Sequence, residues 1–177
     1  MRRLLWAMLF VAAGCGGAAR EALPPPPGSP ERVVACETML KEFGDFDPKQ
    51  HGEAEVTAMM RRADGERAGC AAAMAEQAKT PVEALFARHR AAQFELHALA
   101  LERHLAEAFD GGANRCSIVK DTFAVFFRQL AEVETGLQQE SLTAAEQAKL
   151  TELREMDLKS IDLLFAHAQE QCKELTR

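Results

Sequence analysis

Cysteine and histidine are the side chains of this 177-residue chain most able to do chemistry, and the chain has five of each. One cysteine, Cys15, stands near the start, and the other four are spread along the chain at Cys36, Cys70, Cys116 and Cys172. Cysteines in such numbers either ligate a metal or pair as disulfides, and spacing helps to distinguish the two. No C-x-x-C spacing occurs. A thiolate metal site is therefore the weaker alternative to two disulfides.

Three histidines lie on one predicted helix, in the order His89, His97 and His104. His97 and His104 would stand ~10.5 Å apart along its axis, so they cannot both reach one zinc ion, whose bonds to nitrogen are ~2.1 Å long. A site would need a ligand from another helix. His167 is predicted to lie at the depth of His104, ~36 Å from the starts of two parallel helices. A metal or haem held by His104 and His167 is one hypothesis. The alternative, which we favour, is that the histidines flank the core without a cofactor and bond to carboxylates such as Glu107.

The remaining side chains predict no catalytic site. The four serines lie outside any G-x-S-x-G turn, and the chain after Cys15 has no glycine loop that could hold a phosphate. The segment that begins at Asp45 starts like a calcium loop, but Lys49 stands at a ligand position and Gln50 where that loop needs glycine. The sequence therefore predicts a protein without enzymatic activity.

The elements that would hold these residues are predicted to be helices. From Cys116 to Leu137 the apolar side chains recur at alternating steps of three and four, which places them on one face of an α-helix. The same spacing predicts further helices over about 30–43, 53–79, 80–109 and from 142 onward. Residues 44–48 should end the first helix. Gly65 and Gly69 leave open whether the second is one helix or two, because each glycine weakens a helix by ~1 kcal/mol.

Capping residues precede four of the predicted helices, at Ser29, Thr80, Asn114 and Thr143. Long helices joined by short turns must be antiparallel neighbours. Residues 30–177 are therefore predicted to form one all-α domain, an up-down antiparallel bundle of four long helices plus a short N-terminal helix.

The depth of each cysteine along its predicted helix favours one of the three possible pairings of these four cysteines. If the last two helices form a hairpin, Cys116 and Cys172 both lie at its open end, at depths that differ by only ~6 Å. Cys36 would then pair with Cys70, which requires the first helix to fold back on the second. The sequence therefore predicts a bundle stapled by these two disulfides.

The first fourteen residues predict an export signal. Arg2 and Arg3 precede an apolar run from Leu4 to Val11, and small residues follow as far as Cys15. The run is shorter than the ~20 apolar residues that span a bilayer. Export would bring the cysteines into an oxidising compartment, where an even number of them favours disulfides.

The segment Val11-Ala12-Ala13-Gly14-Cys15 resembles the lipobox of bacterial lipoprotein precursors, although Ala12 stands where that family more often has leucine. The resemblance implies that residues 1–14 are a cleaved signal peptide and that Cys15 carries fatty acyl groups such as palmitate, which anchor the chain in a membrane. Gly16 follows where the family places aspartate for inner-membrane retention. This implies the outer membrane, with the domain facing the periplasm. The resemblance covers only about the first seventeen residues.

Residues 15–29 are predicted to be the lipidated cysteine and a tether, because Gly16-Gly17 is flexible and Pro24 to Pro27 favours polyproline II. Removal of the signal leaves 19 of the 21 basic residues against 27 acidic ones, so the net charge goes from −6 to −8. An acidic domain argues against nucleic acid as a partner.

Two hypotheses about function follow from the sequence. The first is a membrane-anchored lipoprotein of the cell envelope with an interaction or structural role, whose partner is another envelope protein. The second is a periplasmic helical bundle that binds a metal or haem through His104 and His167.

Overall fold

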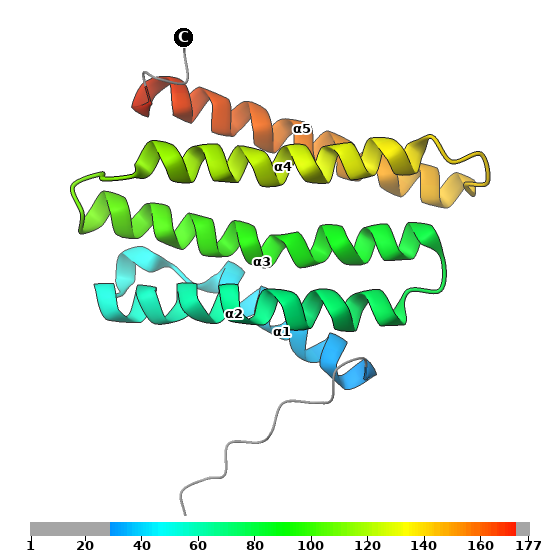
Figure 1. The fold of residues 1–177 in the computed structure, drawn as a ribbon, viewed down its shortest axis with the longest axis horizontal. Helices are drawn as coiled ribbons and strands as arrows, with labels where there is room; N and C mark the ends of the chain where they lie inside the picture. The colour runs from blue at the N-terminus through cyan, green and yellow to red at the C-terminus, as the bar shows by residue number, and fades with distance from the viewer. Residues whose placement is uncertain (1–28, 173–177) are drawn as a thin grey trace, which may run out of the picture.

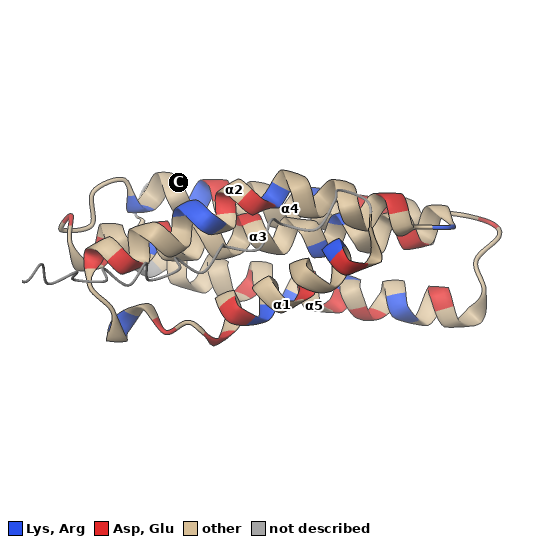
Figure 2. Cartoon of the chain, turned by 90° about the horizontal axis from the view of Figure 1, so that it is seen from below, with Lys and Arg blue, Asp and Glu red and all other residues tan. Residues whose placement is uncertain are grey.

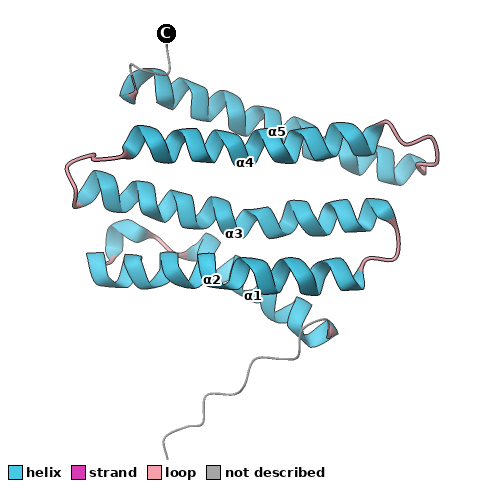
Figure 3. Cartoon of the chain, viewed as in Figure 1, coloured by secondary structure: helices cyan, strands magenta, loops and turns pink. Residues whose placement is uncertain are grey.

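The computed structural model describes residues 29–172, which form helices joined by short loops, without a strand (Figure 3). In chain order the elements are α1 (Pro30–Asp45), a 3-10 turn η1 (Pro48–Gln50), α2 (Glu53–Gln77), α3 (Pro81–Ala108), α4 (Arg115–Leu137) and α5 (Ala144–Gln171). This confirms the predicted all-α fold of four long helices with a shorter one in front. Of the described helices, none combines the length and apolar composition needed to cross a bilayer. The predicted signal, Cys15 and nearly all of the tether lie outside the described residues.

Helices α2, α3 and α4 lie side by side, each antiparallel to the next, and α5 returns along α4 (Figure 1). Helix α1 packs obliquely on α2 and also touches α3. Seen from below, α1 and α5 lie on the same side of the layer that α2, α3 and α4 form (Figure 2). The short loops explain this order, because a chain that turns within a few residues must run back along the helix it has just left.

Three of the four predicted caps hold the starts of their helices. Ser29, Thr80 and Thr143 each accept a hydrogen bond from a backbone N–H of the first turn, and Glu146 completes the predicted capping box with Thr143. Asn114 precedes α4 as expected but makes no side-chain cap, so this prediction is wrong in its mechanism. Its φ of 60° lies in the left-handed region, whereas a capping side chain needs an extended backbone.

The glycines interrupt the helices less than the sequence predicts. Helix α1 runs through Gly44 instead of ending before it, and α2 is one continuous helix through Gly65 and Gly69. A Cβ at Gly69 would stand only 3.0 Å from Arg32 Nη2, so the glycine leaves room for the ion pair of Arg32 with Glu66 between α1 and α2. Tertiary contacts thus outweigh the ~1 kcal/mol that each glycine costs a helix.

Within the described residues, many of the buried apolar side chains gather in three clusters. One joins α1, α2 and α3 around Cys36 and Phe94. A second joins the start of α3 to the end of α4 and the start of α5, around Leu85 and Leu150. The third joins α4 to the second half of α5, around Leu164. Apart from the cluster around Leu85 and Leu150, α3 and α5 share none of these clusters, and a groove lies between the two helices.

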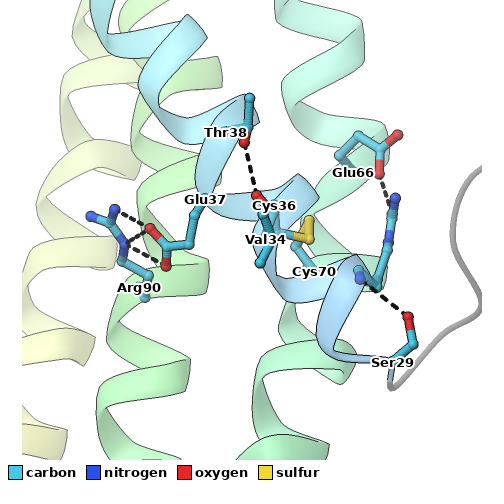
Figure 4. Close-up of a disulfide and its surroundings, with 9 residues drawn as sticks. Ser29, Val34, Cys36, Glu37, Thr38, Glu66, Cys70 and Arg90 are labelled. Carbon is cyan, nitrogen blue, oxygen red and sulfur yellow. Dashed lines mark hydrogen bonds and ion pairs between the residues drawn. A yellow bond between two sulfur atoms is a disulfide. The ribbon is translucent and has the colours of Figure 1, made fainter.

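Both predicted disulfides are present, with the predicted pairing. Cys36 and Cys70 join α1 to α2 with Cα atoms 5.7 Å apart, close to the ion pairs that α1 makes with α2 and α3 (Figure 4). Cys116 at the start of α4 joins Cys172, directly after α5, with Cα atoms 5.6 Å apart. One disulfide therefore staples α1 to α2 and the other staples α4 to α5, while α3 is held by packing and polar contacts.

Removing either disulfide should destabilise the fold by a similar amount. The sequence separations of 34 and 56 residues correspond to losses of about 4 kcal/mol each, because the entropy of loop closure rises only with the logarithm of loop length. The Cys36→Ala/Cys70→Ala and Cys116→Ala/Cys172→Ala variants can be compared with the parent by urea unfolding, followed by far-UV circular dichroism. A loss below about 1 kcal/mol, typical of an ordinary point substitution, would show that the missing disulfide does not hold the fold.

Candidate functional site

A buried polar layer crosses the bundle and consists of His89 on α3, Gln129 on α4 and Asp157 on α5. Their exposed fractions are 7%, 2% and 3%, and among the described residues they are the buried polar or charged side chains. His89 Nε2 lies 3.0 Å from both carboxylate oxygens of Asp157. Gln129 Nε2 donates a hydrogen bond of 3.1 Å to the backbone carbonyl of His89. The layer therefore links three helices at one level of the fold.

Sequence reasoning predicted that His89 flanks the core but did not identify its partner. The acceptor was expected to be a carboxylate such as Glu107, whereas the ion pair of Glu107 is with Arg103, at 3.9 Å. The signal that could have revealed Asp157 is its position seven residues after Leu150 and seven before Leu164, both of which are buried. An acidic residue in the middle of an apolar stripe needs a buried partner.

The other two histidines of α3 occupy different surroundings. His97 is half-buried, with its ring 6.0 Å from that of Phe43. Burial, together with the nearby charge of Arg90, lowers the pKa of His97. His104 packs against the edge of Phe109, with ring centroids 6.3 Å apart.

The alternative metal or haem ligands, His104 and His167, stay a prediction. His167 is exposed and lines the groove between α3 and α5, whereas the ring contact of His104 is with Phe109. Among residues 29–172, as far as their side chains are described, no group of three or more His, Cys, Asp or Glu side chains could hold a metal ion. The described residues therefore supply no further ligand for a metal held by His104 and His167.

The groove between α3 and α5 contains two hollows. The first, the charged hollow, has a volume of about 710 Å³ and is lined from α1, α2, α3 and α5. The second, the apolar hollow, has a volume of about 290 Å³ and lies farther along α3 and α5, with α4 as its floor. Ligand pockets in proteins occupy roughly 300–1,000 Å³, so both hollows have about the size of a ligand site.

The charges of the charged hollow are largely satisfied within the protein. The Arg90 guanidinium donates to both carboxylate oxygens of Glu37, with Nε 3.0 Å from each. Lys149 Nζ lies 4.3 Å from the centroid of the Phe86 ring, a cation–π contact. His89 also lines this hollow, but the described lining contains no serine, threonine or cysteine. The pair of His89 with Asp157 therefore has no hydroxyl or thiol in the described lining that it could activate.

The apolar hollow has a different character. Leu96 and Ala100 of α3, Phe126 of α4 and Leu163 of α5 contribute to its wall. Leu163 keeps 63% of its surface exposed although it is a large apolar side chain. Such an open apolar wall favours an apolar occupant over water.

A third candidate surface, which we call the outer patch, consists of Phe123 and Phe127 on α4 and of Leu158 and Phe165 on α5; the last two are seven residues apart and exposed, and so lie on one face of α5. The ring of Phe123 stacks on Phe127 at 6.0 Å and meets Phe165 edge to face at 6.4 Å. Phe127 and Phe165 remain 54% and 47% exposed. Aromatic side chains gathered in this way on a surface are typical of protein-binding sites.

Ion pairs join the neighbouring helices α2, α3 and α4 at the surface of the layer that they form. Glu95 of α3 forms ion pairs with Arg67 of α2, at 3.3 Å, and with Arg128 of α4. Acidic and basic residues are interleaved along the helices rather than separated by sign (Figure 2). This pattern is typical of a solvated surface.

Comparison with protein-family models, with curated proteins and with solved structures finds no match to this chain. The candidate surfaces are therefore interpreted from their own residues.

Replacing Asp157 should destabilise the fold because the buried His89 imidazole would lose its acceptor. We expect Asp157→Ala to lower the free energy of unfolding by about 1–3 kcal/mol, the cost of an unsatisfied buried polar group. The measurement is urea unfolding at neutral pH, with the exposed Asp162→Ala on the same helix as control. Equal losses in the two variants would contradict a structural role for the pair. The double variant His89→Leu/Asp157→Leu should recover stability, since it removes both polar groups.

The pH dependence of stability should include a contribution from His97. Because its pKa is lowered in the folded state, the unfolded chain binds the proton first, from about pH 6.5 downward. The stability that neutral His97 contributes is therefore complete above about pH 6.5 and is lost as the pH falls toward the lowered folded-state pKa. Urea unfolding at pH 5.5 and 7.5 should show a smaller difference for His97→Gln than for the parent. An unchanged difference would contradict this assignment.

Proposed function

We propose that this chain is a bacterial lipoprotein with a non-enzymatic interaction or structural role. Acyl groups on Cys15 would anchor it in the outer membrane, and the helical domain would face the periplasm and bind another envelope protein. The resemblance of Val11 to Cys15 to a lipobox supports the anchor. The proline-containing stretch that follows is suited to hold a domain away from a membrane surface.

The observation that carries the interaction role is the exposed apolar surface of α5. Among the described helices, α5 packs mainly on α4 and meets α3 at the cluster around Leu85 and Leu150 and at His89. It nevertheless exposes Met156 and Leu163 on the groove side and Leu158 and Phe165 on the outer patch. Large apolar side chains on both flanks of one helix are expected where a second protein covers one of them.

The outer patch is the surface that we assign to the protein partner. Its four side chains come from two helices that a disulfide joins at one end. A surface stapled in this way changes little on binding, which lowers the entropy cost of association.

The lipid anchor can be tested by metabolic labelling. Cells that produce the full chain are grown with an alkyne analogue of palmitate. The parent should incorporate the label and fractionate with the outer membrane, and Cys15→Ser should do neither. In the same cells, a photo-crosslinking amino acid at Phe165 should give one discrete protein adduct. The matched control is the same amino acid at Lys159, an exposed position on another face of α5.

The two parts of this experiment fail in different ways. Label that persists in Cys15→Ser would contradict the lipid anchor. Adducts that are equally abundant from Phe165 and Lys159, or absent from both, would contradict a partner on the outer patch.

A further inference from the structure

The interior of the apolar hollow offers apolar contacts and almost no free hydrogen-bonding groups. Two hydroxyl groups line it, those of Thr122 and Ser160. Thr122 donates to the Ile118 carbonyl at 2.8 Å, and Ser160 to the Met156 carbonyl at 2.9 Å. Each hydroxyl proton is therefore already used within its own helix. The middle of the hollow suits a hydrocarbon chain better than a polar ligand.

One end of the apolar hollow is basic. Arg103 of α3 and His167 of α5 line it, and both come from the parts of these helices that end at the same side of the fold (Figure 1). Arg103 Nε is 3.9 Å from Glu107 Oε1, the long limit of an ion pair, and its side chain is 34% exposed. The guanidinium therefore keeps donors for a second acidic group. A carboxylate suits it best, because guanidinium and carboxylate bond in a charge-assisted pair.

The other end of the apolar hollow lies next to the buried polar layer. Asp157 precedes Ser160 by one helical turn, and its two carboxylate oxygens face His89 Nε2 at 3.0 Å. Both carboxylate oxygens of Asp157 thus already have a hydrogen-bonding partner, and Asp157 itself does not line the apolar hollow. A ligand that fits would thus have one acidic head at the open end and an uncharged tail at the inner end.

We infer that the apolar hollow binds a medium-chain fatty acid as its monoanion. Its hydrocarbon chain would lie against Leu96, Ala100, Phe126 and Leu163, and its carboxylate would bond to Arg103. Arg103 lies seven residues after Leu96, which is ~10 Å along the helix, so the chain that fits is of medium rather than full membrane length. The site lies on the groove side of α5, away from the outer patch, and does not depend on the proposed protein partner.

Titration calorimetry with sodium decanoate tests the inference directly. The protein is the full chain carrying Cys15→Ser, exported so that its disulfides form and free of acyl groups that would compete. Decanoate should bind one to one, about tenfold tighter than decan-1-ol, as expected for one charge-assisted hydrogen bond. Decyltrimethylammonium, which has the same chain and the opposite charge, should bind more weakly than either.

Substitutions separate the head from the tail. Arg103→Gln should weaken decanoate about tenfold and leave decan-1-ol unchanged, whereas Glu107→Gln should tighten decanoate by freeing the guanidinium. Ala100→Phe should abolish binding of both by filling the hollow. The matched control is Ala124→Phe, at an exposed alanine of α4 that lines a hollow on the other side of the helix layer. Far-UV circular dichroism checks that each variant folds.

Three results would overturn the inference. Equal affinity for decanoate and decan-1-ol would show that no carboxylate site exists. Binding that survives Ala100→Phe would place the ligand elsewhere. Failure of decanoate to bind, together with a protein adduct from a photo-crosslinker at Leu163, would identify the groove as a docking site for a protein segment.

Discussion

Burying the Asp157 carboxylate against the His89 imidazole fixes the position of α5 relative to α3. A carboxylate shielded from water is costly unless it is paired and hydrogen-bonded, and here both of its oxygens face Nε2 at 3.0 Å. Any sliding of α5 along α3 would separate these groups. The pair holds the two helices at a defined level although they do not pack closely along their length. The two hollows of the groove lie on either side of Asp157 along α5.

Each disulfide joins two helices that are consecutive in the chain, and neither one links α1 and α2 to α4 and α5. Cys36–Cys70 staples α1 to α2, and Cys116–Cys172 staples α4 to α5. Helix α3 joins the two sides through apolar packing and through ion pairs such as those of Glu95 with α2 and α4. Helices α3 and α4 also approach closely at Gly136, where a Cβ would stand 2.6 Å from Leu85 Cδ1. The covalent links thus stabilise the fold while the α3–α5 groove stays open.

Helix α5 has more apolar surface than its packing on α4 requires. The two flanks differ in chemistry. The outer patch is aromatic and lies on the surface, while the groove side is a hollow with an arginine at one end. Aromatic rings on a surface suit a protein partner, and an apolar trough with a basic end suits an anionic amphiphile. One helix can therefore support a protein contact and a ligand site without overlap.

Much of the fold could be predicted from the sequence, because the period of the apolar residues and the caps at Ser29, Thr80 and Thr143 are local properties of the chain. The disulfide pairing could also be predicted, because the fixed rise per residue of an α-helix gives the position of each cysteine along its helix. The reason for a glycine at position 69 within a continuous α2 could not be predicted, because it is the close approach of Arg32 from another helix. The partner of His89 was missed for the same reason: periodicity places a side chain on a face but does not say which face of another helix lies opposite. Sequence alone determined the helices and how they could be joined. The pairing of His89 with Asp157 and the hollows beside it were decided by tertiary structure, because both arise where side chains distant in the chain meet.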